Sequence, residues 1–272
     1  MDICYNKNMK KPPEILGKIA ESTLVRVAKA KEALPLEKLS SLITTHYPLS
    51  TTFKQALSTP NLSFICEVKK ASPSKGVIAE NFPYMEIAKD YEEGGAAAIS
   101  VLTEPEFFLG SDQYLREISA AVSIPTLRKD FIIDEYQIYE AKLWGAKAVL
   151  LICALLEPQI ISSYIKTANK LEIDCLVEIH SEAEAEEAVE AGAKIIGINN
   201  RDLVTFNVDT NLTARLCKLL PKNTITVAES GIQSCDDIRA LKDTGVNAVL
   251  IGESLMRAPD RKKFLRELLD IK

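Results

Sequence analysis

The chain has 272 residues, and 47% of them are apolar, which is enough to bury one sizeable core. The formal net charge is −5, so the chain has no overall basic surface and nucleic acid is not an expected partner. No apolar run is long enough to cross a bilayer, and the N-terminus lacks the apolar stretch of a signal peptide, so we expect a cytoplasmic protein that does not bind membranes.

The cysteines and histidines do not form a metal-binding pattern. The six cysteines include no Cys-x-x-Cys pair, and the two histidines, His46 and His180, lack the spacing of zinc ligands. Several cysteines fall in apolar runs, where a free buried thiol is the expected state. We therefore predict no metal ion in the site.

The first 62 residues have a helical pattern of their own. Glu14–Leu34 predicts an amphipathic helix that ends before Pro35, and residues 52–57 predict a short second helix. No disordered tail or long linker separates these helices from the rest of the chain. We expect an N-terminal helical extension, residues 1–62, to a fold that begins at Ser63.

From Ser63 onward, short apolar runs alternate with longer segments of helical periodicity. The runs are almost continuously apolar, which is typical of parallel strands covered on both faces. Eight strands are predicted: Ser63–Lys69, Ala97–Leu102, Ile124–Lys129, Ala148–Cys153, Cys175–Ile179, Ile195–Asn199, Ile225–Ala228 and Ala248–Ile251.

A glycine precedes several of these strands. Gly95, Gly145, Gly192 and Gly245 hold the position after a predicted helix, where the backbone needs positive φ. Eight such units predict an α/β fold, a TIM (β/α)8 barrel, better than an open doubly wound sheet, and no Gly-x-Gly-x-x-Gly follows the first strand. We expect one domain over residues 1–272, in which the N-terminal extension either caps the barrel or covers its active face.

The first predicted strand carries two opposite charges. Glu67 and Lys69 lie two residues apart, so they point to the same side of the strand. If that side faces the interior, both charges must be paired or used in chemistry, because an isolated buried ion is very costly. On these residues alone, a structural ion pair and a catalytic pair are equally open. The turn from Ser72 to Ser74 adds hydroxyl and N–H groups at the end of the strand.

Polar side chains recur at the C-terminal ends of the other strands, which form the active face in a TIM barrel. A single charge there would be an ordinary solvated loop residue, but a set at equivalent positions indicates a site. Ser230-Gly231 and Gly252-Glu253 follow the seventh and eighth strands, where such barrels hold phosphate through backbone N–H groups. The alternative to a phosphate site is that turn geometry alone requires these glycines.

Seven motifs in unbroken order resemble those of the indole-3-glycerol phosphate synthase family. The resemblance covers the chain from about Ser63 to Met256 and extends weakly into the N-terminal helices. The motifs are Glu67-x-Lys69-x-x-Ser72-Pro-Ser74, Ala97-Ala-Ile-Ser-Val-Leu-Thr103-Glu, Leu127-Arg-Lys129-Asp-Phe131, Leu176-Val-Glu178-Ile-His, Ile196-Gly-Ile-Asn199-Asn-Arg201-Asp-Leu203, Ala228-Glu229-Ser230-Gly231-Ile and Ile251-Gly252-Glu253-Ser254-Leu-Met.

The resemblance implies a ring-closing lyase of tryptophan biosynthesis. The family converts 1-(2-carboxyphenylamino)-1-deoxyribulose 5-phosphate into indole-3-glycerol phosphate, with loss of carbon dioxide and water and without a cofactor. By resemblance, Lys129 is the general acid at the substrate ketone, and Glu178 accepts or donates a proton in the dehydration. Glu67 and Lys69 form a coupled pair beside them, with Lys69 as a second candidate acid.

The resemblance also implies how an acidic protein binds a substrate with a carboxylate and a phosphate. Lys69, Lys129 and Arg201 would be focused on it, and Arg201 and Ser72 would each hold one of the two anionic groups, with the assignment open. The other expected contacts are Asn199 at the hydroxyls, Ser230 beside Glu229, the phosphate loops with Gly231, Gly252 and Glu253, and Phe108, Phe131 and Leu203 around the aromatic ring. We expect a monomer, with a partner enzyme of the pathway left open.

Two other functions remain open at this point. One is another phosphate-binding barrel enzyme, either a sugar-phosphate isomerase or a Schiff-base aldolase. An isomerase would not need two lysines together with Glu67, and an aldolase would require Lys69 or Lys129 as a neutral nucleophile. The other is a catalytically silent barrel used as a scaffold, which has no reason to retain buried charges.

Overall fold

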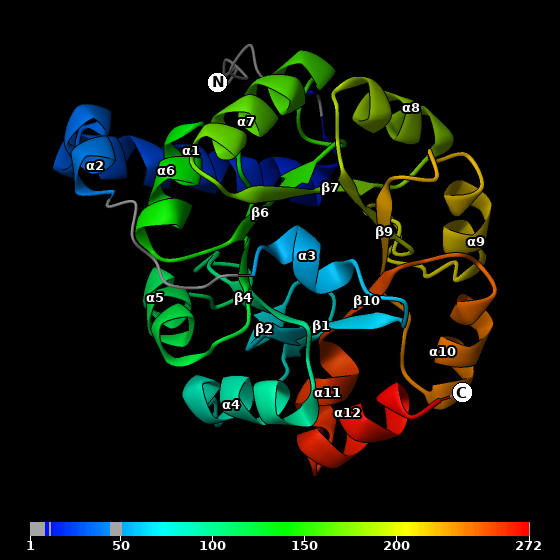
Figure 1. Cartoon of the computed structure of the whole chain (residues 1–272). Helices are drawn as coiled ribbons and strands as arrows, with labels where there is room; N and C mark the ends of the chain where they lie inside the picture. The colour runs from blue at the N-terminus through cyan, green and yellow to red at the C-terminus, as the bar shows by residue number, and fades with distance from the viewer. Residues whose placement is uncertain (1–8, 11, 44–50, 272) are drawn as a thin grey trace.

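The computed structural model describes residues 9–10, 12–43 and 51–271. Eight parallel strands close into a barrel in the spatial order β1-β10-β9-β8-β7-β6-β5-β4 (Figure 1). The barrel strands are β1 (Ser63–Val68), β4 (Ala98–Leu102), β5 (Thr126–Lys129), β6 (Ala148–Ile152), β7 (Asp174–Ile179), β8 (Ile195–Asn199), β9 (Ile225–Glu229) and β10 (Ala248–Ile251). The predicted (β/α)8 barrel is confirmed, and each strand ends within two residues of its predicted bounds.

Both faces of the barrel are covered, which explains the continuous apolar runs. β6 and β10 are buried at every position. β1 closes the barrel by pairing Ile65 with Leu250 on one side and with Ala98 on the other. The surrounding helices are α4 (Tyr84–Gly94), α5 (Asp112–Ala121), α6 (Tyr136–Leu143), α7 (Pro158–Lys170), α8 (Glu182–Glu190), α9 (Asn211–Cys217), α10 (Cys235–Lys242), α11 (Glu253–Arg257) and α12 (Arg261–Leu269).

Local signals set the ends of these helices. Ser111, Ser181 and Ser234 each accept a backbone N–H of the following helix through the side-chain oxygen. At the other ends, the predicted glycines have positive φ, for example 102° at Gly95 and 89° at Gly145. The helices before β4, β6, β8 and β10 are thus stopped just before a strand, and the parallel strands present their C-terminal ends on one face.

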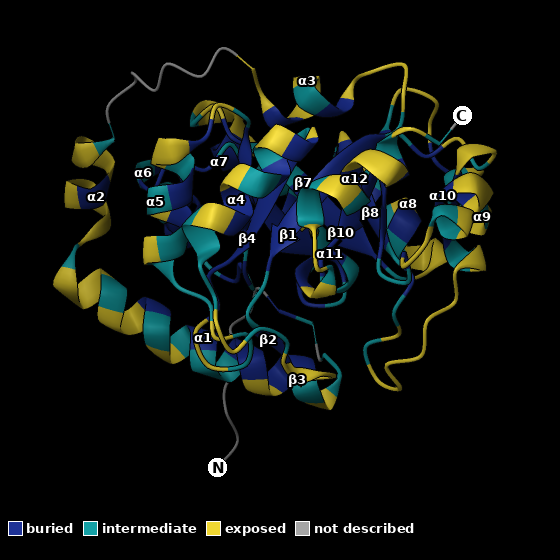
Figure 2. Ribbon diagram, turned by 90° about the horizontal axis from the view of Figure 1, so that it is seen from below, coloured by how far each residue is buried: buried dark blue, intermediate teal, exposed yellow. Residues whose placement is uncertain are grey.

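The N-terminal extension packs on both ends of the barrel. α1 (Glu14–Ala33) and α3 (Phe53–Leu57) confirm the two predicted helices. The sequence prediction lacks α2 (Leu36–Leu42), because Pro35 ends α1 and is also the N-cap of the next helix. Figure 2 shows α1 on the side of the short hairpin β2 (Ala71–Ser72) and β3 (Gly76–Val77), with α3 on the opposite side. Residues 1–8, 11 and 44–50 of the predicted extension, including His46, lie outside the described ranges.

The extension shares the core of the barrel. Leu16 and Ala20 of α1 and Phe53 and Leu57 of α3 belong to the same buried hydrophobic cluster as the strands. α1 and α3 are therefore packed parts of the fold. Within the described ranges, no helix has both the length and the apolar character that a membrane span needs.

Candidate active site

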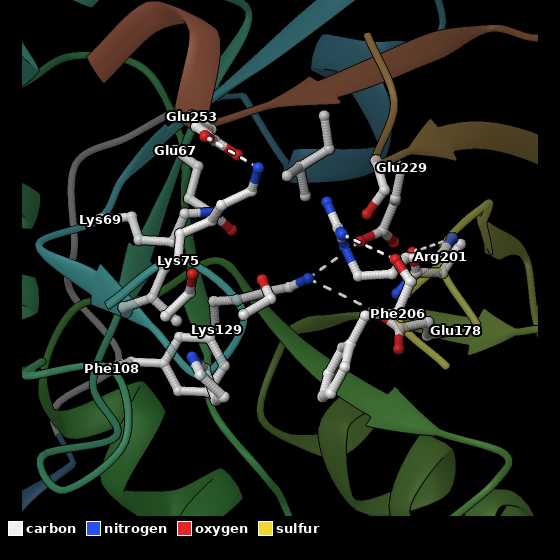
Figure 3. A pocket seen from close by; sticks show the side chains of 18 of the residues that line it. Glu67, Lys69, Lys75, Phe108, Lys129, Glu178, Arg201, Phe206, Glu229 and Glu253 are labelled. Carbon is white, nitrogen blue, oxygen red and sulfur yellow. Dashed lines mark hydrogen bonds and ion pairs between the residues drawn. The ribbon is translucent and has the colours of Figure 1, made fainter. Parts of the chain in front are cut away.

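A cavity of about 570 Å³ lies at the C-terminal ends of the barrel strands (Figure 3). α1 closes part of it with Ile15, Leu16 and Ile19. Every residue that the sequence predicts for the site lines this cavity: Glu67, Lys69, Ser72, Phe108, Lys129, Phe131, Glu178, Asn199, Arg201, Leu203, Glu229, Ser230, Gly231, Gly252 and Glu253. The fold brings the whole set together, while the chemical role of each residue stays a prediction.

Lys69 follows β1 and forms an ion pair with Glu67 on that strand. Lys69 Nζ lies 2.7 Å from Glu67 Oε1, and Ser100 donates a hydrogen bond of 3.3 Å to Glu67 Oε2. Burial opposes ionisation of Glu67, but the positive charges of Lys69 and then Lys129 outweigh it, so the pKa of Glu67 is lowered. Glu67 is therefore an ionised carboxylate at neutral pH, and its ion pair borders the cavity.

Lys129, at the end of β5, places its ammonium between two carboxylates. Its Nζ lies 2.9 Å from Glu229 Oε2 and 3.5 Å from Glu178 Oε2, and we call these three side chains the floor cluster (Figure 3). Burial alone would lower the pKa of Lys129, but the attraction of Glu229, Glu178 and Glu67 is stronger and raises it. Lys129 is therefore protonated at neutral pH, and it can donate a proton or stabilise developing negative charge.

Glu229 ends β9 and is the carboxylate of the floor cluster that protonates most readily. Burial raises its pKa, the charge of Lys129 opposes this rise, and the charge of Glu178 adds to it, so that the pKa of Glu229 is about 7. Its side chain fits because Gly197 has none: a Cβ atom there would stand 2.1 Å from Glu229 Oε1. Glu229 can thus exchange a proton near neutral pH while it contacts Lys129.

Glu178, on β7, is the other carboxylate of the floor cluster. Burial opposes its ionisation, but the charges of Lys129 and His180 and a hydrogen bond with Asn199 outweigh burial and lower the pKa of Glu178. The sequence prediction does not include His180, whose Nε2 lies 3.4 Å from Glu178 Oε1 outside the cavity lining. Within the described ranges, no group of His, Cys, Asp and Glu side chains is arranged to hold a metal ion.

The loops after β9 and β10 bring backbone close to the cavity. Ser230 and Gly231 both have positive φ, 64° and 83°. At Gly252, a Cβ atom would lie 2.6 Å from Glu67 Oε1 and 3.0 Å from Lys69 Nζ, so only glycine lets the chain pass beside that ion pair. Ser230, Gly231 and Gly252 all line the cavity, at the position predicted for a phosphate.

An acidic side chain stands at the predicted phosphate position. Glu253 Oε1 lies 3.1 Å from Arg257 Nε and 3.7 Å from Lys75 Nζ, and we call these three side chains the rim cluster. Lys75 and Arg257 also line the cavity, but the sequence prediction does not include them. Lys75 could have been predicted, because it directly follows the Ser72–Ser74 turn. Arg257 could not, because nothing in the sequence of its C-terminal helix indicates that it reaches the cavity.

One wall of the cavity is apolar. The rings of Phe108 and Phe131 have their centroids 5.8 Å apart, and Leu203 and Phe206 also line the cavity. The sequence prediction does not include Phe206, which has a φ of 60° and accepts a hydrogen bond from Arg201 Nη1 through its carbonyl oxygen. The wall contains the three predicted ring contacts, Phe108, Phe131 and Leu203, whose role stays a prediction.

A buried carboxylate shapes the loop that carries Phe108. Glu104 accepts the backbone N–H groups of Glu106, Phe107 and Phe108 at 3.0, 2.7 and 3.0 Å. A carboxylate that accepts several backbone bonds fixes the local turn. The position of Phe108 in the wall therefore depends on Glu104.

α1 is tied to the strand end that carries Lys129. Arg26 donates to both oxygens of Asp130 at 2.9 and 2.7 Å, and Arg128 and Thr103 donate to the same carboxylate. Burial opposes ionisation of Asp130, but Arg128 and Arg26 hold its pKa well below the usual range. Sequence reasoning missed this contact, because the two partners of the Arg26–Asp130 pair are far apart in the chain.

Comparisons with known proteins identify the family and the fold. The sequence model of the indole-3-glycerol phosphate synthase family matches residues 16–268. The indole-3-glycerol phosphate synthase of Ruminiclostridium cellulolyticum is 54% identical over 257 residues, which cover 93% of this chain and 98% of that protein. The synthase of Endomicrobium trichonymphae is 54% identical over 258 residues, 94% of this chain and 100% of the relative. Among solved structures, 3-hexulose-6-phosphate synthase from Salmonella typhimurium shares the fold alone, with a TM-score of 0.61, 15% identity and coverage of 77% and 98% of the two chains.

Proposed function

The chain belongs to the indole-3-glycerol phosphate synthase family, and we propose on that basis that it converts 1-(2-carboxyphenylamino)-1-deoxyribulose 5-phosphate into indole-3-glycerol phosphate, carbon dioxide and water. This is an indole-forming step of tryptophan biosynthesis. The observation that carries the proposal is the ammonium of Lys129, held in the cavity by two buried carboxylates. An apolar wall and cationic side chains surround it, as an aromatic and doubly anionic substrate requires.

Ring closure needs an acid at the substrate ketone. The aromatic carbon that bears the carboxylate attacks the carbonyl carbon, and the carbonyl oxygen gains a proton. We assign this proton to Lys129, because its raised pKa keeps it charged until the oxygen becomes basic enough to accept the proton. Loss of carbon dioxide from the same ring carbon then restores the aromatic ring.

Dehydration needs an acid and a base. The hydroxyl formed from the ketone leaves as water, and the ring carbon between it and the nitrogen loses a proton as the indole carbon–carbon double bond forms. Glu178 is our candidate base, because its lowered pKa keeps it ionised. Glu229, with a pKa of about 7, can return the proton to Lys129 over 2.9 Å. Lys69 remains a second candidate acid, held next to Glu67.

The substrate has two anionic groups, and we assign different cationic side chains of the cavity to each. We place the phosphate at the loops with Ser230, Gly231 and Gly252, which line the cavity beside Lys69 and whose backbone N–H groups would bind it. The substrate carboxylate is then assigned to Arg201, which donates a hydrogen bond to the carbonyl oxygen of Phe206 in the apolar wall. Folding a flexible substrate between these anchors can supply up to roughly 7–11 kcal/mol of the barrier reduction.

The Schiff-base alternative is not supported by the charges in the cavity. A nucleophilic lysine must be neutral, which is favoured by an apolar pocket or by a neighbouring cation. Lys129 has the opposite surroundings, two carboxylates that raise its pKa. An aldolase would therefore need a neutral Lys129, although the carboxylates of Glu178 and Glu229 favour its charged form.

Three further properties are also proposals. Residues 1–272 act as one catalytic unit, supported by the contact of α1 with the cavity and with Asp130. A monomer is sufficient, because one chain supplies all the described cavity side chains. A cytoplasmic location is supported by free thiols at Cys66 and Cys153 that lie buried in apolar surroundings.

The direct test is an assay with the anthranilate-linked deoxyribulose phosphate and no added cofactor. We expect indole fluorescence to rise with time. Borohydride with the same substrate should trap no covalent adduct. A flat trace from folded protein would contradict the proposed reaction, and a trapped lysine adduct would favour the aldolase.

A further inference from the structure

His180 is a largely buried titratable side chain that the proposed reaction does not use. It follows Glu178 by two residues, and only 13% of its side chain is exposed. It does not line the cavity, so it has no direct access to a bound substrate. Any effect that it has on the reaction must pass through a neighbour.

One side of the ring is fixed by Glu184, in the first turn of α8. Glu184 Oε2 accepts the backbone N–H of His180 at 2.6 Å and lies 3.2 Å from its Nδ1. A carboxylate can only accept hydrogen bonds, so Nδ1 must carry a proton. The same oxygen holds both the backbone and the ring, which fixes the ring's orientation.

The other side of the ring faces Glu178. His180 Nε2 lies 3.4 Å from Glu178 Oε1 and has no hydrogen bond of normal geometry to any described residue. In a neutral ring with its proton on Nδ1, Nε2 would turn a lone pair towards the carboxylate. In an imidazolium, Nε2 turns an N–H towards it. Two carboxylates on opposite sides of the ring therefore favour the charged form.

The surrounding charges act in the same direction. Burial alone would lower the pKa of His180, but the hydrogen bond to Glu184 and the charges of Glu178 and Glu184 outweigh it and raise the pKa. The charged or titratable groups that act on His180 or on its two carboxylates are Glu178, Glu184, Glu229, Asp202, Lys129 and Cys153. Most of these groups are acidic, and Lys129 acts on the far oxygen of Glu178.

We propose that His180 is a positioning residue, which as an imidazolium holds Glu178 ionised and directs its second oxygen towards Lys129. Glu178 would then have one oxygen at each cation: Oε1 at His180 and Oε2 at Lys129. The kinetic part of this proposal rests on the proposed function. Its structural part, the charge of His180, does not.

The kinetic test compares two substitutions that each keep one half of the ring's hydrogen bonding. In His180→Asn the amide can replace Nδ1 at Glu184 but does not reach Glu178, whereas in His180→Gln it can reach the place of Nε2. We expect His180→Asn to move the acid limb of the kcat/KM profile upwards by about one pH unit, with kcat about tenfold lower on the acid side of the wild-type limb and KM little changed. His180→Gln should recover part of both.

The control is Glu186→Gln, which removes one negative charge from an exposed position of α8. It should leave the profile unchanged. The same charge is removed, at the imidazole itself, by the Glu184→Gln variant described below. A role limited to stability predicts that His180→Asn lowers the melting temperature but keeps the wild-type profile. That result would overturn the proposal.

A second measurement needs no activity. The chain has only two histidines, so a His46→Gln variant leaves His180 as the single imidazole in an NMR pH titration. We expect the ring to stay protonated above the ordinary histidine pKa of about 6.5, and Glu184→Gln to lower its midpoint. A ring that is neutral at pH 6.5 would overturn the proposal even in an active enzyme. A charged ring in a protein that forms no indole would contradict the proposed function instead.

Discussion

The floor cluster and the rim cluster are built from the same kinds of side chain, yet burial gives them different properties. In the floor cluster, the side chains of Lys129, Glu178 and Glu229 are 3–14% exposed. In the rim cluster, those of Lys75, Glu253 and Arg257 are 29–50% exposed. Charges interact strongly in the first environment and are screened by water in the second.

This difference indicates a division of labour within one cavity. The floor cluster shifts pKa values in opposite directions, with Glu178 lowered and Glu229 raised to about 7 around one lysine. Such pairs are suited to proton transfer. The exposed rim charges are suited to attracting and holding an anion. Substitutions in the floor should therefore change kcat, and those in the rim should change KM.

The largest effect is expected at the centre of the floor cluster. Lys129→Ala should lower kcat about 10²–10⁴-fold, because it removes the proposed acid and its positive charge. The measurement is steady-state indole formation, with circular dichroism to show that the barrel remains folded. The exposed Lys166→Ala on α7 is the matched control and should behave as wild type. Near-normal turnover of Lys129→Ala would remove this residue from its proposed role.

A smaller effect is expected from crowding Glu229 without removing any charge. In Gly197→Ala the new Cβ atom would stand 2.1 Å from Glu229 Oε1, so the carboxylate must move away from it. We expect kcat to fall about 100-fold, as for other displacements of about 1 Å in a catalytic group. Wild-type kcat in this variant would show that the contact between Glu229 and Lys129 does not matter for the reaction.

The strands and most of the cavity could be predicted because their signals are local. An apolar run such as 148–152 and a glycine such as Gly145 each report on their own neighbourhood, and the barrel then places every strand end on one face. Glu67 and Lys69 are close in the sequence, so their pairing also follows from strand geometry.

The residues that the sequence did not predict depend on contacts between distant parts of the chain. Asp130 is ion-paired with Arg26 of α1, and its role is invisible without the packing of the extension. Phe206 lies in an irregular loop whose path no periodicity reports. The sequence did not predict α2, because a proline such as Pro35 is equally compatible with the end of one helix and the start of the next.

The floor cluster should also leave a signature in the pH dependence of stability. The pKa of Glu229 is raised from 4.5 to about 7 in the folded protein, so the folded state binds this proton more tightly than the unfolded state does. Stability is therefore lost as pH rises through this window, and Glu229→Gln removes that loss. We expect the variant to gain roughly 3 kcal/mol over wild type between pH 4.5 and 7 in urea denaturation. A constant difference across the window would show that Glu229 ionises normally.

The smallest effect, and one of opposite sign, is expected at the rim. Glu253 brings a negative charge to the proposed phosphate site and occupies Arg257 and Lys75. Glu253→Gln should release both cations for the substrate and lower KM about threefold, within the range of exposed ion pairs, while kcat stays unchanged. The exposed Glu267→Gln on α12 removes the same charge away from the cavity and should leave KM as it is. The change in KM should also shrink as salt is added, because the rim is open to screening. A fall in kcat would instead mean that Glu253 takes part in the chemistry, and the division between floor and rim would then be wrong.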